Sequence, residues 1–136
     1  MDSKIALIKL YYLLVHADGE VNEREVTLGN HMTQVEGILE SDFKSILESL
    51  KDRDRETIFS EGVAALKKLD HQKKVRYVAW LCLVANADGF MDKAEWQFIY
   101  KIYNTELKLN LDEIMKVQKE LLTLTTKRTL SFSILL

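Results

Sequence analysis

The sequence contains no proline and only five glycines in 136 residues. All-β chains need many tight turns, and proline and glycine are the residues that such turns most often use. Their scarcity argues against a β fold and favours long helices joined by short connections. With 47% hydrophobic and 29% charged residues, the chain has the size and composition of one soluble domain that buries its own core.

Cysteine is almost absent as well, because Cys82 is the single one. An intramolecular disulfide is therefore excluded, which fits a reducing compartment. Cys82 lies within the apolar run VAWLCLVANA, so we interpret it as a buried structural thiol and not as a nucleophile.

Long apolar runs and a strong net charge are also missing. No run reaches the roughly eighteen residues of a transmembrane helix, and the apolar start lacks the basic region and cleavage site of a signal peptide. The net charge of −2 gives no general attraction to nucleic acid. We therefore expect a cytoplasmic protein that does not bind nucleic acid.

Apolar residues recur with helical spacing along almost the whole chain, which predicts an all-α fold: a single compact bundle of about seven helices over residues 1–126. Two stretches, residues 3–17 and 75–85, are apolar on nearly all sides and are predicted to lie in the middle of the bundle. The helices are expected from Ser3 to Ala17, from Glu23 into the low thirties, from Ser41 or Asp42, and after Asp54, Asp70, Asp92 and Asn110.

Two further segments have an unusual composition. Lys67, Lys68, Lys73, Lys74 and Arg76 surround the junction of the fourth and fifth helices. We favour a solvated polar face there, and the functional alternative is a docking patch for an acidic partner or a membrane surface. Residues 127–136 lack acidic side chains and end apolar, so this tail docks on the bundle, mediates association or frays.

A short motif occurs twice, seventy residues apart, as ADGEVNERE and ADGFMDKAE. Each copy has a glycine suited to end one helix, an N-cap residue three positions later, and a capping-box glutamate three positions after that. These residues are Gly19, Asn22 and Glu25 in the first copy and Gly89, Asp92 and Glu95 in the second. The motif therefore predicts a corner that stops one helix and starts the next.

The aspartate before each glycine is not explained by that structural role. Asp18 and Asp88 fall at the C-terminal ends of helices, where a negative charge costs about 0.3–1 kcal/mol. An Asx-turn is one way to offset this cost, and a bound cation is the other.

The spacing of the corner matches the second half of an EF-hand loop, with Asp18 at position 5, Asn22 at position 9 and Glu25 at position 12. The first ligand of such a loop is missing in both copies, so a complete EF-hand is not predicted. The oxygen donors that remain suit Ca²⁺ or Mg²⁺ with water in the other positions. The candidate metal ligands are Asp18, Asn22, Glu25, Asp88, Asp92 and Glu95.

Two such corners in an all-helical chain of this length resemble the tellurite-resistance TerB family, over about residues 3–126. The chain is also similar to the N-terminal domain of a membrane-anchored DnaJ-type co-chaperone. The resemblance implies a compact bundle of about seven helices, acidic corner residues as metal ligands, and a cytoplasmic role in stress response or in assemblies at the inner face of the membrane. It carries over to Asp18, Glu25, Asp88, Asp92 and Glu95, whereas Asn22 stands where the family commonly has an acid.

We therefore expect a non-catalytic module that binds a divalent cation at its corners and docks an unidentified protein partner, as a monomer or weak dimer. The alternative is a pure interaction scaffold whose corners are structural and hold no metal. A third interpretation, an enzyme that uses the acidic cluster, lacks a recognisable nucleophile or phosphate loop. No catalytic or organic-cofactor residue is predicted.

Overall fold

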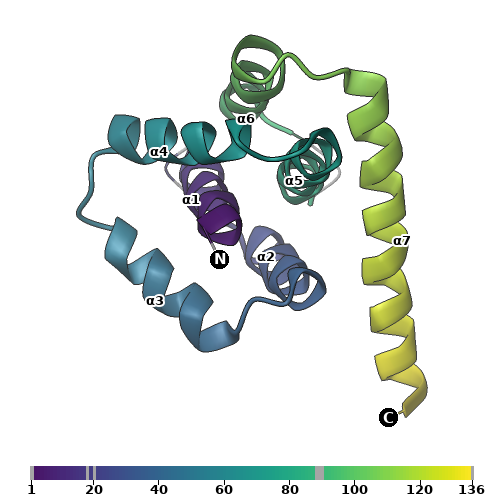
Figure 1. Ribbon diagram of the computed structural model, residues 1–136. Coiled ribbons are helices and arrows are strands. Elements are labelled where there is room, and N and C mark those ends of the chain that lie inside the picture. Colours follow the sequence, from purple (N-terminus) through teal and green to yellow (C-terminus); the bar gives the residue numbers. More distant parts are fainter. Residues whose placement is uncertain (1, 18, 20, 88–90, 136) are drawn as a thin grey trace.

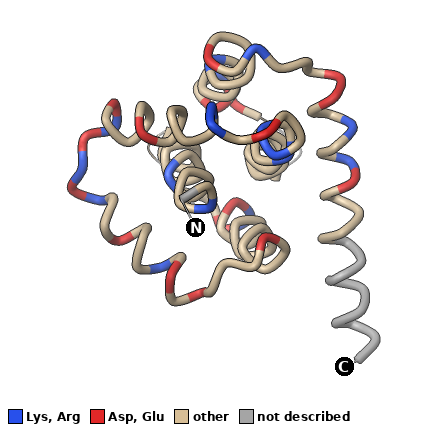
Figure 2. The backbone as a smooth tube through the Cα atoms, in the orientation of Figure 1, with Lys and Arg blue, Asp and Glu red and all other residues tan. Residues whose placement is uncertain are grey.

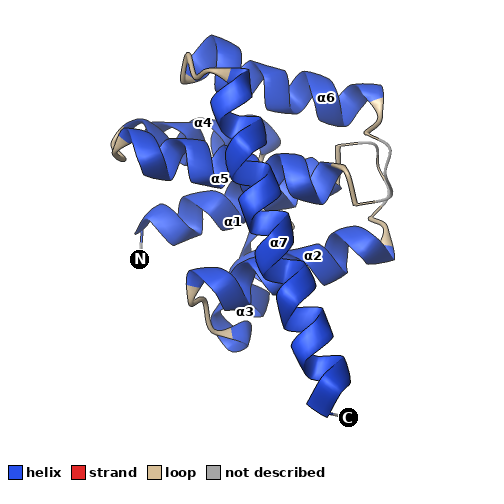
Figure 3. Ribbon diagram, turned by 90° about the vertical axis from the view of Figure 1, so that its right-hand side faces the viewer, coloured by secondary structure: helices blue, strands red, loops and turns tan. Residues whose placement is uncertain are grey.

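The structure is a computed structural model that describes residues 2–17, 19, 21–87 and 91–135, with side chains from Ser3 to Thr125 within these ranges. All regular structure in this part of the chain is helical (Figures 1 and 3), which confirms the predicted all-α fold. The elements are α1 (Asp2–Val15), α2 (Glu23–Glu36), α3 (Glu40–Leu50), α4 (Arg55–Lys67), α5 (His71–Ala85), α6 (Lys93–Tyr100), η1 (Lys101–Glu106) and α7 (Leu111–Leu135).

Helices α1 and α5 form the middle of the bundle, as their all-round apolar character predicts (Figure 1). Every residue from Tyr77 to Ala85 is buried, and Trp80 is completely inaccessible. Helix α4 packs along α1 and α7 packs along α5, whereas α2 contacts mainly α5 and α6 contacts both α5 and α1. The two central helices are therefore covered by helices from both halves of the chain.

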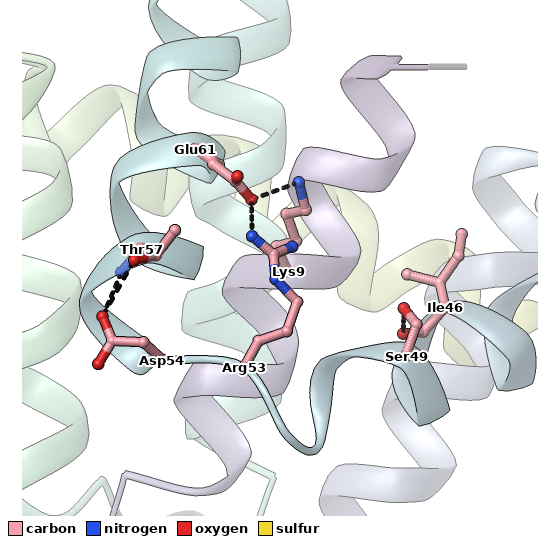
Figure 4. A network of polar contacts seen from close by, with 7 residues as sticks. All are labelled: Lys9, Ile46, Ser49, Arg53, Asp54, Thr57 and Glu61. Carbon is pink, nitrogen blue, oxygen red and sulfur yellow. Dashed lines mark hydrogen bonds and ion pairs between the residues drawn. The ribbon is translucent and has the colours of Figure 1, made fainter.

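The contact between α4 and α1 is reinforced by a polar network at the surface (Figure 4). Glu61 of α4 accepts hydrogen bonds from Lys9 of α1 at 3.1 Å and from Arg53 at 2.6 Å. These bonds lower the pKa of the Glu61 carboxyl. Asp54 caps the start of α4 by accepting from the backbone N–H of Thr57 at 3.0 Å, so the predicted start of this helix is confirmed.

The third helix begins one residue earlier than predicted. Ser41 and Asp42 lie inside α3, whose first turn is closed by a hydrogen bond from Phe43 N–H to the Leu39 carbonyl at 2.9 Å. Gly37, with φ of 73°, ends α2 just before it. No side-chain cap is formed at Leu39, so the polar residues that usually signal a helix start were misleading here.

The sixth helix changes its hydrogen-bonding pattern in a way that the sequence does not predict. After Tyr100 the chain continues as the π-helical turn η1, in which Leu107 N–H bonds to the Ile102 carbonyl at 2.9 Å. The wider turn keeps Ile102 and Tyr103 buried. Trp96, in the first turn of α6, is 40% exposed.

Helix α7 continues to Leu135, and its end projects beyond α2 in both ribbon views (Figures 1 and 3). The backbone of residues 127–135 is thus part of one long helix. Within the described ranges, none of the helices has the length and apolar character needed to cross a bilayer.

Candidate metal centre

The first corner has the predicted geometry wherever the structure describes it. Gly19 takes the left-handed conformation with φ of 86°, after the last turn of α1. Asn22 Oδ1 accepts from Glu25 N–H at 2.9 Å, and Glu25 Oε1 accepts from Asn22 N–H at 3.1 Å. Both bonds of a capping box are therefore present, as the spacing predicts.

The second corner also starts its helix with a side-chain N-cap. Asp92 Oδ1 accepts from Glu95 N–H at 2.8 Å at the beginning of α6. Asp88 and Gly89, like Asp18 in the first corner, lie outside the described residues. The predicted roles of the two aspartates thus remain predictions.

The fold brings the two corners to the same edge of the bundle. Helix α2 packs mainly on α5 and α6 packs on both α5 and α1, and the two helices begin on one side of the molecule (Figure 3). The glutamates three positions into each helix point inward, with Glu25 only 4% and Glu95 only 7% exposed. The sequence predicted a separate site at each corner, whereas the structure brings the corners together in one acidic cluster. We define this acidic cluster by Asn22, Glu25, Asp92 and Glu95.

This cluster places acidic groups together in a poorly solvated position. Burial, hydrogen bonding with the Glu25 and Asp92 carboxyls, and the charges of those two groups together raise the pKa of Glu95 to about 9. Oε2 of Glu95 is buried and has no hydrogen-bond partner among the residues that the structure describes. A buried carboxylate beside other carboxylates is unstable unless a proton or a cation accompanies it. The cluster is therefore a place where positive charge is needed.

The described part of the cluster is not a complete metal centre. Within residues 2–17, 19, 21–87 and 91–135, no three histidine, cysteine, aspartate or glutamate side chains are arranged so that they could hold an ion by themselves. Asn22 and Asp92 are half-buried caps, so their oxygens are shared with the helix starts. A metal would require additional donors from the turns or from water.

Tyr11 is a further residue of this site that sequence reasoning missed. Its hydroxyl group donates to the backbone carbonyl of Glu25 at 3.2 Å, which fixes the first turn of α2 against α1. Burial, followed by the charge of Glu25, raises the pKa of Tyr11 well above its ordinary value. Gly29 leaves the space for this ring, since a Cβ there would lie 2.6 Å from Tyr11 Cζ. A tyrosine opposite a helical glycine could have been noticed, although nothing in the spacing predicts their contact.

Two of the basic residues near the junction of α4 and α5 pair with glutamates from other elements. Lys67 forms an ion pair with Glu106 at 3.2 Å, and Arg76 donates to Glu36 at 2.6 Å. The Glu36 carboxylate also accepts from the Trp80 indole N–H at 2.7 Å, so Arg76 belongs to an inter-helix contact between α2 and α5. Figure 2 shows how basic and acidic residues are distributed along the chain. The choice between a solvated polar face and a docking patch stays a prediction.

A family model described as tellurite resistance protein TerB matches residues 4–118, which is most of the chain. No curated protein and no solved structure matches. The matched range includes both corners, α1 to η1 and the beginning of α7.

Proposed function

The chain belongs to the TerB family, and we propose that it is a non-catalytic helical module that binds a divalent cation at the acidic cluster and docks a protein partner. The observation that carries the cation proposal is the meeting of Glu25 and Glu95, two buried glutamates from the two copies of the motif. A module that only needed two helix corners would have no reason to bury both glutamates at one point.

The donor set indicates the type of cation. Carboxylate and amide oxygens are hard ligands, which suit Ca²⁺ or Mg²⁺ with water in the remaining positions. Glu25 and Glu95 would supply the buried donors and Asp92 a half-buried one. Asp18 and Asp88 precede these helices by a few residues in the sequence and are proposed to complete the site. A cation held in this way would tie both corners together.

The test is a calorimetric titration of the protein with Ca²⁺ and with Mg²⁺, repeated on Glu95→Gln and Asp88→Asn. Glutamine and asparagine preserve the size of the side chains that they replace and carry no charge, so both variants are expected to lose the binding heat. Glu48→Gln removes one charge from the exposed face of α3 and is expected to bind like the wild type. A wild type without binding heat, or a Glu95→Gln variant with unchanged affinity, would contradict the proposed cation site.

The alternative is a pure interaction scaffold in which a proton takes the place of the cation. The raised pKa of Glu95 favours this alternative, because at neutral pH the group already retains its proton. The same titration separates the two, since a scaffold has no cation-dependent heat. Its melting temperature would also rise no more with Ca²⁺ than with a salt control of equal ionic strength.

The second part of the proposed function is the docking of a protein partner in a cytoplasmic assembly linked to stress response. Assemblies at the inner face of the membrane are included in this proposal. This part of the proposal rests on membership of the family and on a surface that a partner could use. It is tested separately, with the surface described below.

A further inference from the structure

A groove of about 840 Å³ lies between α4 and α6, with the end of α1 as its floor. Its α4 wall includes Arg55, Phe59, Val63 and Lys67, which follow one another at four-residue spacing over the whole helix. Residues one helical turn apart lie above one another on one face, so this stripe is about 18 Å long. The opposite wall consists of Ala94 and Phe98 of α6 and of Lys101 at the start of η1, which are spaced as i, i+4 and i+7. The groove is therefore a trough between two helical stripes.

Small residues make the groove hollow and aromatic residues make it apolar. Ala17 after α1, Ala64 on α4 and Ala94 on α6 all line it, and none of them fills the space between the walls. The rings of Phe59 and Phe98 meet across it edge to face, with their centroids 5.9 Å apart. Such a surface fits the apolar face of a third helix laid along the trough.

The charged residues along the groove favour an acidic occupant. The Lys101 ammonium lies 4.6 Å from the centre of the Phe59 ring, which belongs to the α4 wall of the groove. Arg55 is exposed at one end of the groove, and Lys67 at the other end is paired with Glu106. Glu56 is the second acid of the lining. Among the residues that the structure describes, three basic groups against two acidic ones give the rim a net positive charge.

A second copy of this chain fits the groove less well. The amphipathic helix α3 already buries Phe43 and Leu50 within the bundle. Helix α7 exposes Leu122 and Leu124, but the sequence that follows them carries Lys127 and Arg128. A basic segment does not complement a basic rim.

We propose that the groove between α4 and α6 docks an acidic amphipathic helix of a partner protein, about three turns long. Its apolar face would cover Phe59 and Phe98, and an acidic side chain on its flank would meet Lys101. This groove would be the surface on which the protein partner of the proposed function docks. The proposal rests on the proposed function only in this respect. It uses none of the residues of the acidic cluster.

The test is fluorescence anisotropy with two labelled synthetic helices of about 14 residues, a length that matches the groove. Both carry the same leucine stripe, with glutamates on the flanks of one and lysines on the flanks of the other. In buffer with EDTA, the acidic helix is expected to bind and the basic helix to bind about tenfold more weakly or not at all. The EDTA keeps this result independent of the cation titration, so either proposal can fail alone.

Variants inside and outside the groove test whether the acidic helix binds in the groove. Ala64→Gln fills the groove from an exposed helical position without changing its charge, and it is expected to weaken binding of the acidic helix by about tenfold, which corresponds to about 1.4 kcal/mol. Lys101→Glu is expected to weaken it by a similar factor. Ser45→Gln on α3 and Lys116→Glu on α7 introduce the same side chains at exposed positions outside the groove and are expected to leave the affinity unchanged. Circular dichroism of each variant checks that the helices are intact.

Three results would overturn the proposal: no binding of the acidic helix, equal binding of both helices, or an affinity that Ala64→Gln does not change. Sedimentation at increasing protein concentration tests the other candidate occupant, a second copy of this chain. A dimer that forms in the wild type and is lost in Ala64→Gln would assign the groove to that second copy and reject the partner helix.

Discussion

Glu25 at the start of α2 and Glu95 at the start of α6 are seventy positions apart in the sequence and meet in one buried cluster. They occupy equivalent positions in the two copies of the corner. The meeting follows from the packing of both helices on the centre of the bundle, because α2 packs mainly on α5 and α6 packs on both α5 and α1. The two copies of the motif thus contribute to a single acidic cluster.

The first prediction concerns the pH dependence of stability. Glu95 titrates near its ordinary value of 4.5 in the unfolded chain and at about 9 in the folded protein, so the folded state retains a proton that the unfolded state loses. The stabilisation from this group is complete below pH 4.5 and disappears as the pH rises through 9. In EDTA, the melting temperature of the wild type should fall over this range by several degrees relative to Glu95→Gln. Glu48→Gln should follow the wild type, and parallel curves for the wild type and Glu95→Gln would contradict the assignment.

The second prediction concerns Gly29. Glycine to alanine in a helix usually stabilises by up to about 1 kcal/mol. Here the new Cβ would meet the Tyr11 ring, so Gly29→Ala should instead destabilise by about 1–3 kcal/mol in urea unfolding. Asn30→Ala changes the next, exposed residue and should have little effect. The loss should be smaller in a Tyr11→Phe background, because the closest atom to the new methyl group is then gone.

The sequence predicted most of the fold because its signals are local. Asp54, Asp70 and Asn110 cap helices at the predicted starts, since an N-cap needs only a backbone N–H three residues away. The central positions of α1 and α5 followed from their all-round apolar character. The start of α3 and the π-helical turn after Tyr100 could not be predicted in this way, because backbone hydrogen bonds and tertiary packing decide them.

The candidate site was predicted residue by residue, but its assembly was not. The spacing within each corner identified Glu25 and Glu95 as capping-box partners, and the first of these boxes is complete. Their contact depends on where α2 and α6 pack, which is a tertiary property without a local signal. The same holds for Tyr11, whose role depends on the approach of α2 to α1.

The third prediction concerns Glu36, which connects α2 to α5. Its carboxylate accepts from Arg76 and from the Trp80 indole, and its side chain is only 10% exposed. Glu36→Ala leaves the completely buried Trp80 without a partner, so we expect a loss of about 2–3 kcal/mol in the free energy of unfolding. Glu48→Ala removes an ion pair with Lys51 that is largely exposed and should cost less than about 1 kcal/mol. Equal losses in the two variants would show that the bonds of Glu36 contribute no more than a surface pair.

The last prediction concerns Cys82. The thiol is 2% exposed in the middle of α5, and burial raises its pKa to about 12. Because only the thiolate reacts with disulfide reagents, the native protein should react with Ellman's reagent very slowly at pH 8. In concentrated guanidinium chloride the same thiol should react at once and with full stoichiometry. Ser45→Cys adds an exposed thiol on α3 as an internal reference, and it should react quickly while Cys82 remains protected. Rapid reaction of Cys82 in the folded wild type would mean that α5 opens to solvent, which is incompatible with its place at the centre of the bundle.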